Sequence, residues 1–322
     1  MQLVGKKEQI APYAGEVRPR GARGRAGVVL AALLVAACGT ACGSSGPDAA
    51  GGAAGHGAKA APGLAGPAGV QARKAAEAAR LRQAEQARIA AAKRWGLAKT
   101  PLLAPAAPKV KPEITFRKGF EVEDGDDLPP IFTTVPTKDR VVFLTIDDGA
   151  EKDPEFLRMM SELKIPYTAF LSDYLVRSDY GYFKKMQDLG VTLNNHTLNH
   201  RYLPALSYEK QRQEICGQQD TIEKQFGKRP EVFRPPYGNY NEDTLRAAKS
   251  CGIKYAPLWN AEAFTDHMEW REWDRDLHPG DIILTHFRGR EDWKGTMPDM
   301  IRQVMKTVTD KGYAVAKLED YL

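Results

Sequence analysis

The sequence predicts an α/β fold, in which a parallel sheet with crossover helices forms a β/α barrel, for one domain at the C-terminal end of the chain. From about residue 141 onward, short apolar runs alternate with stretches of helical spacing, and this alternation is typical of parallel sheets. Polar residues with reactive side chains directly follow several of the apolar runs, as they do where the strands of a barrel end on one face. About the first hundred residues are instead rich in Ala, Gly, Pro and Arg and poor in aromatic residues, so they cannot supply a core.

The expected elements follow one another from residue 139 to 322, which we take as the folded domain. The first strand, 141–146, is a nearly continuous apolar run, as expected for a strand covered on both faces. The first helix, 154–163, places its apolar residues on one face. The same two criteria predict the remaining elements, which in chain order are strand 167–171, helix 182–189, strand 191–194, helix 208–226, strand 232–234, helix 242–251, strand 255–259, strand 281–284, helix 298–311 and strand 313–317.

The charge of the chain excludes few functions. The formal net charge is +5 over 322 residues, and many of the basic residues precede the folded domain. This charge does not imply nucleic-acid binding, and we expect no nucleic-acid partner. A solvated basic segment accounts for it, although a basic arm can also contact anionic lipid or anionic wall polymers.

The N-terminal residues 1–38 have the form of a secretory signal. Six basic residues precede an apolar run at 27–37, and this run is far shorter than the roughly 20 residues that span a bilayer. The run ends in Val-Ala-Ala-Cys38, which resembles the lipobox of bacterial lipoproteins. We therefore expect an exported protein held by a lipid on Cys38 at the outer face of the cell membrane. With a plain signal peptide instead, the protein would be secreted.

Residues 39–138 are predicted to form a flexible linker that contains one helix. Gly, Ala, Pro and Ser dominate its first part, whereas 71–95 has no Gly or Pro and is followed by Gly96 at the position of a helix C-cap. The apolar face of this helix is mostly alanine, so we expect a spacer that lifts the domain off the membrane. Four prolines then favour an extended chain over 97–113.

Two cysteines, Cys216 and Cys251, lie inside the folded domain. They fall in two predicted helices that should be neighbours in a sequential β/α order. In an exported chain they can form a disulfide or remain two buried thiols.

A candidate metal site combines two histidines with a pair of aspartates. His196 and His200 are four residues apart, on one face if the segment is helical. This spacing alone is weak evidence, but Asp147 and Asp148 follow the first predicted strand. Because a hydrolytic zinc site needs three protein ligands and an open position for water, one aspartate can complete the ligand set. The other aspartate would stay unligated and act as a general base.

Together with two further segments, these residues resemble the polysaccharide deacetylase family, the carbohydrate esterases of family 4 that share the NodB homology domain. The resemblance covers 139–322 and implies a distorted β/α barrel of the NodB type. The segments that match the first, second, third and fifth motifs of the family, in order along the chain, are Thr145 to Gly149, His196 to His200, Arg234 to Gly238 and Leu284 to His286.

The resemblance implies a role for each matching residue. Asp147 would be the general base and His286 the general acid, while Asp148, His196 and His200 would bind a divalent metal, zinc or cobalt. Around this centre, Arg234 would orient Asp147, and Thr197 would steady the loop between the histidines. The backbone N–H of Tyr237 would stabilise the oxyanion. The substrate pocket would be lined by Pro235, Trp259 and Leu284. Trp259 is also consistent with a place in the core.

The fourth motif departs from the family pattern, in which an aspartate before a tryptophan orients the general-acid histidine. An ungapped alignment places Thr265 at the position of that aspartate. Glu262 or Asp266 can substitute for it from a shifted loop. If neither does, His286 lacks its partner, and we expect lowered rather than abolished activity.

The sequence thus predicts a metal-dependent hydrolase, monomeric, that deacetylates N-acetylglucosamine residues of peptidoglycan or of chitin-like glycans. Acetylated xylan is an alternative substrate. A glycan-binding module that keeps the metal site without catalysis is a second class of function, and a metal amidohydrolase for small molecules is a third. The serine-nucleophile motif G-x-S-x-G is absent from the predicted domain, so no covalent serine intermediate is expected.

Overall fold

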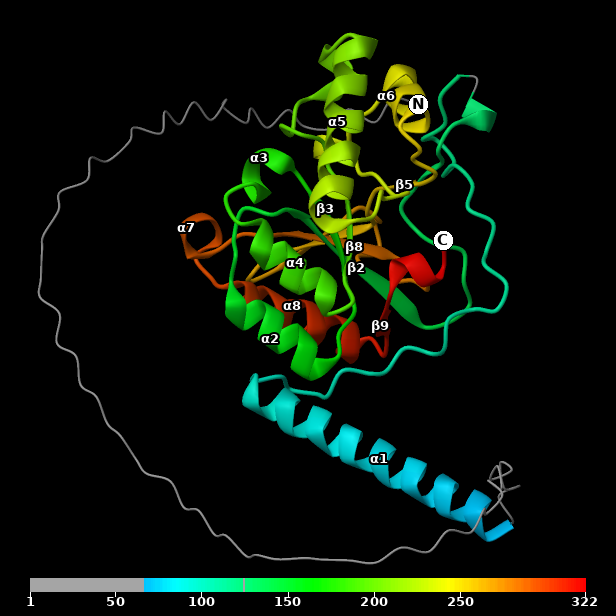
Figure 1. Ribbon diagram of the computed structural model, residues 1–322, viewed down its shortest axis with the longest axis vertical. Coiled ribbons are helices and arrows are strands. Elements are labelled where there is room, and N and C mark those ends of the chain that lie inside the picture. Colours follow the sequence, from blue (N-terminus) through cyan, green and yellow to red (C-terminus); the bar gives the residue numbers. More distant parts are fainter. Residues whose placement is uncertain (1–66, 124) are drawn as a thin grey trace, which may run out of the picture. The chain divides into compact units, whose positions relative to one another are not determined.

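The computed structural model describes residues 67–123 and 125–322 (Figure 1). Cys38, the predicted signal segment 1–38 and the first part of the predicted linker lie outside the described residues. Within the described part of the chain, no helix combines the length and the apolar character needed to span a bilayer.

The centre of the fold is a seven-stranded sheet in the order β4-β3-β2-β8-β6-β7, with β9 also paired to β2. All pairings are parallel except that between β6 and β7. Every residue of β2 is buried, because this strand has neighbours along both edges and is covered on both faces, as its unbroken apolar run predicts. The strands are β2 (Val141–Asp148), β3 (Thr168–Leu171), β4 (Thr192–Asn195), β6 (Ala261–Ala263), β7 (Met268–Trp270), β8 (Ile282–His286) and β9 (Ala314–Ala316).

Isolated bridges close the path of strands into a distorted barrel. A parallel pair, β1 (Ile131–Phe132) with β5 (Ala256–Pro257), lies between β4 and the start of β8. The closing bridges join Asn195 to Phe233, Val232 to Tyr255 and Thr134 to Asp281. The predicted α/β barrel is therefore confirmed, although three of the connections in its wall are single bridges and not full ladders.

The predicted strand 232–234 is wrong: the structure has only the two bridges at Val232 and Phe233 there. Pro230 precedes these residues, and Pro235 and Pro236 follow them. Because proline has no N–H to donate to a sheet and favours only extended or turn conformations before it, a longer ladder cannot form. The predicted strand 255–259 shortens to β5 for the same reason, since β5 ends at a proline.

The predicted helices of the domain are all present, with ends within about two residues of the expected ones. Side-chain caps fix several of these ends. Asp153 accepts a hydrogen bond from the Glu155 N–H at the start of α2, and Thr296 and Asp299 form a capping box at the start of α8. The helices of the domain are α2 (Pro154–Leu163), α3 (Asp173–Val176), α4 (Tyr180–Asp188), α5 (Tyr208–Phe226), α6 (Glu242–Ser250), α7 (Arg290–Trp293) and α8 (Met297–Asp310).

The segment before the barrel packs against it more than the sequence predicted. Helix α1 (Pro67–Arg94) begins four residues before the predicted helix 71–95, ends one residue before its end and is mostly exposed, but Ala91, Ala92 and Trp95 are buried against the domain core. The Trp95 indole N–H donates to Glu162 of α2 at 2.6 Å. Residues 116–128 carry four apolar side chains that pack on β1 and β5. These residues therefore pack on the domain and do not form the predicted flexible linker, because burial of their apolar side chains is more favourable than their exposure to water in an extended chain.

A disulfide joins Cys216 of α5 to Cys251, which immediately follows α6. The two helices lie side by side, and the Cα atoms of the cysteines are 5.1 Å apart. Of the two arrangements that the sequence left open, the structure has the bonded one.

Candidate active site

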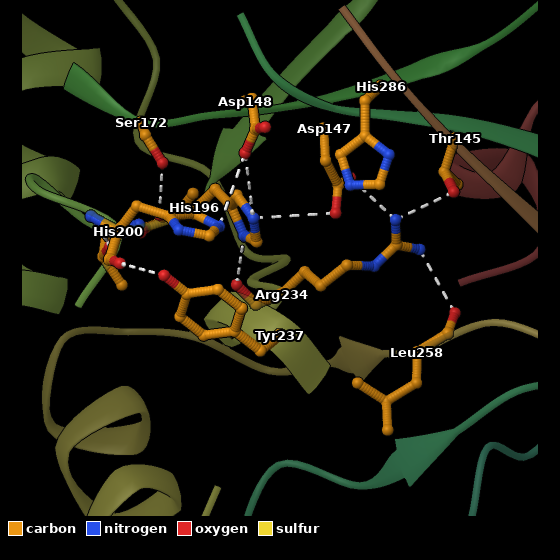
Figure 2. Close-up of polar contacts among 12 residues, drawn as sticks. Thr145, Asp147, Asp148, Ser172, His196, His200, Arg234, Tyr237, Leu258 and His286 are labelled. Carbon is orange, nitrogen blue, oxygen red and sulfur yellow. Dashed lines mark hydrogen bonds and ion pairs between the residues drawn. The ribbon is translucent and has the colours of Figure 1, made fainter. Parts of the chain in front are cut away.

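The residues singled out from the sequence meet at the carboxyl ends of the strands (Figure 2). Asp147 and Asp148 end β2, His196 follows β4, and His286 ends β8. In the parallel register Asp147 lies opposite His286. Because the strands of a β/α barrel end on one face, side chains that are up to about 140 positions apart in the chain line one site.

Three side chains are arranged so that they can hold a metal ion. One donor atom each of Asp148, His196 and His200 lies within 4.8 Å of the other two. The Asp148 Oδ1 atom is 3.7 Å from the His196 Nε2 atom and 3.4 Å from the His200 Nε2 atom. This oxygen is buried and has no hydrogen-bond partner among the described residues. A buried acceptor without a partner, facing two imidazole nitrogens, fits a divalent cation.

The protonation states of the two histidines support this assignment. The His196 Nδ1–H donates to the Arg234 carbonyl oxygen at 2.7 Å, so its Nε2 atom faces the aspartates with a free lone pair. Burial lowers the pKa of His196 and of His200 to about 4 in each case. Both imidazoles are therefore neutral at physiological pH, which is the form that binds a metal.

The two histidines lie on a loop and not on a helix. Thr197 and His200 both have positive φ angles, 70° and 52°, which no helix contains. The Asn195 Oδ1 atom accepts a hydrogen bond from the Thr197 N–H at 2.8 Å, and the Thr197 Oγ1 atom accepts one from the His200 N–H at 3.0 Å. Side chains thus take the N–H groups that a helix would pair with its backbone, and the loop brings the imidazole ring centroids to 4.8 Å.

The two adjacent aspartates have opposite electrostatic environments. Burial raises the pKa of Asp147 above its ordinary value, although Arg234 acts against this shift. Burial also acts to raise the pKa of Asp148, but the nearby imidazoles and Arg288 hold it below its ordinary value. Neighbouring carboxyl groups whose pKa values are pushed apart take different roles. Asp147 is suited to accept a proton, and Asp148 is suited to remain an ionised ligand.

Arg234 holds Asp147 in place from beneath the site. Its side chain is completely buried and lies 4.3 Å from the ring centroid of Phe170. Its guanidinium donates four hydrogen bonds, to Asp147 Oδ1 at 2.8 Å, Thr145 Oγ1 at 2.9 Å, the Pro257 carbonyl at 2.9 Å and the Leu258 carbonyl at 3.2 Å. Because all three nitrogens of the buried guanidinium donate hydrogen bonds, the Asp147 carboxylate has little freedom to turn.

Glu262 is the carboxylate that faces His286. Its Oε1 atom lies 3.5 Å from the His286 Nδ1 atom. The structure does not support the alternative, since Asp266 is exposed and pairs with His267 at 2.6 Å. Glu262 lies opposite Leu284 in the β6–β8 register, and side chains two positions apart on a strand share a face. Glu262 therefore reaches His286 from strand β6, and not from a shifted loop as the sequence led us to expect. Thr265 donates to the Trp293 carbonyl at 2.9 Å.

Replacing Glu262 with glutamine is expected to lower kcat by about 10-fold. Burial first, and then the charges of Glu269 and Asp147, raise the pKa of Glu262 to about 7, so its negative charge is present above that pH. The loss of activity should be largest above pH 7, where Glu262 is ionised in the parent and glutamine places no negative charge beside His286. Asp266→Asn is the matched control and should keep the parent pH–rate profile. Identical profiles for all three proteins would exclude Glu262 as the partner of His286.

The remaining candidate residues surround the site. Tyr237 has a φ angle of 61° and is 56% exposed, and its ring centroid lies 4.6 Å from that of His200. Pro235 and Leu284 are buried next to the catalytic candidates. Trp259 is partly buried against Gly238, where an added Cβ would come within 2.9 Å of the ring. Its ring packs under the turn of the third motif, and its contact with a sugar stays a prediction.

Sequence reasoning missed Arg288, which lies beside the candidate metal ligands. Its Nη2 atom donates to the Asp148 Oδ2 atom at 2.7 Å. The available signal was its position two residues after His286, beyond the end of the fifth motif.

Comparison with known proteins agrees with the geometry. The family model for polysaccharide deacetylase matches residues 134–256. An uncharacterized protein from Streptomyces coelicolor is 40% identical over 203 residues, which are 63% of this chain and 81% of that protein. A peptidoglycan-N-acetylglucosamine deacetylase from Bacillus cereus is 25% identical, over 58% of this chain and 91% of that enzyme. The structure of a family 4 carbohydrate esterase from Bacillus anthracis superposes with a TM-score of 0.50 at 28% identity, over 59% of this chain and 86% of that one.

Proposed function

The chain belongs to the polysaccharide deacetylase family, and on this premise we propose that it hydrolyses the acetamido groups of N-acetylglucosamine residues in peptidoglycan or a chitin-like glycan, with zinc or cobalt as its metal. One observation carries the proposal: a set of three possible metal donors lies next to a second carboxylate, that of Asp147, which is not one of the three. The 25% identical relative named as a peptidoglycan-N-acetylglucosamine deacetylase supports the choice of substrate.

Asp148, His196 and His200 would hold the metal, which when bound supplies Lewis-acid activation of water and of the acetyl carbonyl. Asp147 accepts the proton of the attacking water. Its pKa, raised by burial, makes it a stronger base than an exposed aspartate, and Arg234 fixes its orientation. The chain thus supplies a base whose proton affinity is raised by burial and whose orientation Arg234 fixes.

On the other side of Asp147, His286 delivers a proton to the departing nitrogen. The negative charge of Glu262 stabilises the protonated imidazole that this step needs. The backbone N–H of Tyr237, a residue with a φ angle of 61° in the turn of the third motif, donates to the oxyanion.

The site can be tested by following acetate release. The purified protein with added zinc should release acetate from acetylated chitooligosaccharides and from peptidoglycan, and the ratio of the two rates identifies the preferred glycan. Acetylated xylan tests the alternative of ester hydrolysis. A glycan-binding module without catalysis would bind these polymers and release no acetate from any of them.

We also propose that the protein is monomeric and is exported and anchored through a lipid on Cys38. A lipid anchor on the outer face of the cell membrane would keep the enzyme next to its wall substrate. The support for the export and the anchor is the lipobox-like sequence alone.

A further inference from the structure

Each of the two adjacent aspartates has an arginine of its own. Arg234 binds Asp147 at 2.8 Å, and Arg288 binds Asp148 at 2.7 Å. The first pair belongs to the machinery described above. The second pair involves a residue outside the motifs that identify the site, and it contacts a carboxylate that is only 4% exposed.

The backbone holds Arg288 over Asp148. The Phe287 N–H donates to the Asp147 carbonyl at 3.0 Å, and the Glu151 N–H donates to the Phe287 carbonyl at 3.0 Å. The Phe287 ring is completely buried, with edge contacts to Phe156 and Phe183. This anchor precedes Arg288 directly, so the core of the domain fixes the backbone from which the Arg288 side chain reaches Asp148.

The two carboxylate oxygens of Asp148 have different surroundings. Oδ2 accepts the hydrogen bond from Arg288. Oδ1 is buried, has no hydrogen-bond partner among the described residues, and faces the two imidazoles of the candidate metal site. We propose that Arg288 is a positioning residue that restricts Asp148 to coordination through Oδ1 alone. The inference rests on the metal site of the proposed function.

Coordination through one oxygen matters for the reaction. A carboxylate that is free to turn can offer both oxygens to a cation, and the second oxygen would occupy a position that water or the acetyl oxygen needs. A guanidinium donor to one oxygen prevents this, because a charge-assisted hydrogen bond fixes the carboxylate plane. The other ion pair of Arg288, with Asp292 at 3.8 Å, is too long and too exposed to account for its placement.

The test uses cobalt, whose visible absorption weakens as its coordination number rises. The full chain is stripped of metal and titrated with Co²⁺ for the parent, Arg288→Met, Arg288→Lys and the control Arg290→Met, which changes an exposed arginine of α7. We expect Arg288→Met to bind cobalt with lower absorption per ion and a changed band shape. Arg288→Lys should recover part of the parent spectrum, since an ammonium can also donate to Oδ2 and keeps the charge. Arg290→Met should match the parent.

Three results would overturn the inference. A parent spectrum in all Arg288 variants would show that Asp148 needs no partner to keep its orientation. A changed affinity with an unchanged spectrum would show that Arg288 acts only through its charge. Failure of the parent to bind cobalt would exclude the metal site itself, and this outcome is distinct from the other two. If Arg288→Met does not fold, the comparison of Arg288→Lys with the parent decides between the outcomes.

Discussion

Replacing Asp147 with asparagine is expected to reduce the rate of acetate release by about 10²–10⁴-fold, the usual contribution of a general base. The amide keeps the shape of the side chain and can still accept a hydrogen bond from Arg234, but it cannot take a proton from water. Metal binding should persist, because the donor atoms belong to Asp148, His196 and His200. A variant that retains bound zinc and loses turnover would therefore separate the base from the metal site.

The same aspartate should determine the acidic limb of the pH–rate profile of the parent. Burial raises its pKa, and a base works only when ionised, so activity should fall at a higher pH than for an exposed aspartate as the solution is acidified.

The control for Asp147→Asn is its unfolding midpoint. The change leaves the buried Arg234 without a negative partner, and breaking such a pair costs about 3–5 kcal/mol. If folded, zinc-loaded Asp147→Asn turns over within tenfold of the parent rate, Asp147 is not the general base.

Replacing His200 with alanine is expected to abolish zinc binding and to reduce acetate release to the background rate. A site with three protein ligands that loses one retains two, which do not hold zinc against a competing chelator. The measurement is the zinc content after dialysis against a chelator, together with acetate release. His267→Ala is the matched control, since His267 is about half exposed and pairs with Asp266 away from the metal donors.

The pH dependence of zinc binding provides a second readout for this prediction. Because burial lowers the pKa of His196 and of His200 to about 4, both imidazoles keep their neutral form well below the ordinary pKa of histidine. Zinc should remain bound as the pH falls through 6 and should be released only as it approaches the lowered values. Release near pH 6 would show that these histidines are not buried ligands, as would full zinc occupancy in His200→Ala.

The local patterns of the sequence predicted most of the barrel. The continuous apolar run of β2, the helical spacing of α2 and the length of α5 are properties of short segments, and the structure confirms them. The prediction of a strand at 232–234 was wrong because it used the apolar residues alone and took no account of the prolines around them, which have no N–H to donate. The packing of Trp95 and of residues 116–128 on the domain was also not predicted, because the composition of a segment does not show which of its few apolar side chains pack against the domain.

The chemical types at the site and their order along the chain can be read from the sequence: two aspartates after one strand, two histidines after another, and a third histidine near the C-terminus. Three contacts became known from the folded structure: Glu262, and not Asp266, faces His286, Cys216 pairs with Cys251, and Arg288 reaches Asp148. The reason is that such contacts depend on the register of neighbouring strands and on how helices pack. A shift of one residue in a strand turns a side chain to the opposite face, and no pattern within a single segment fixes that choice.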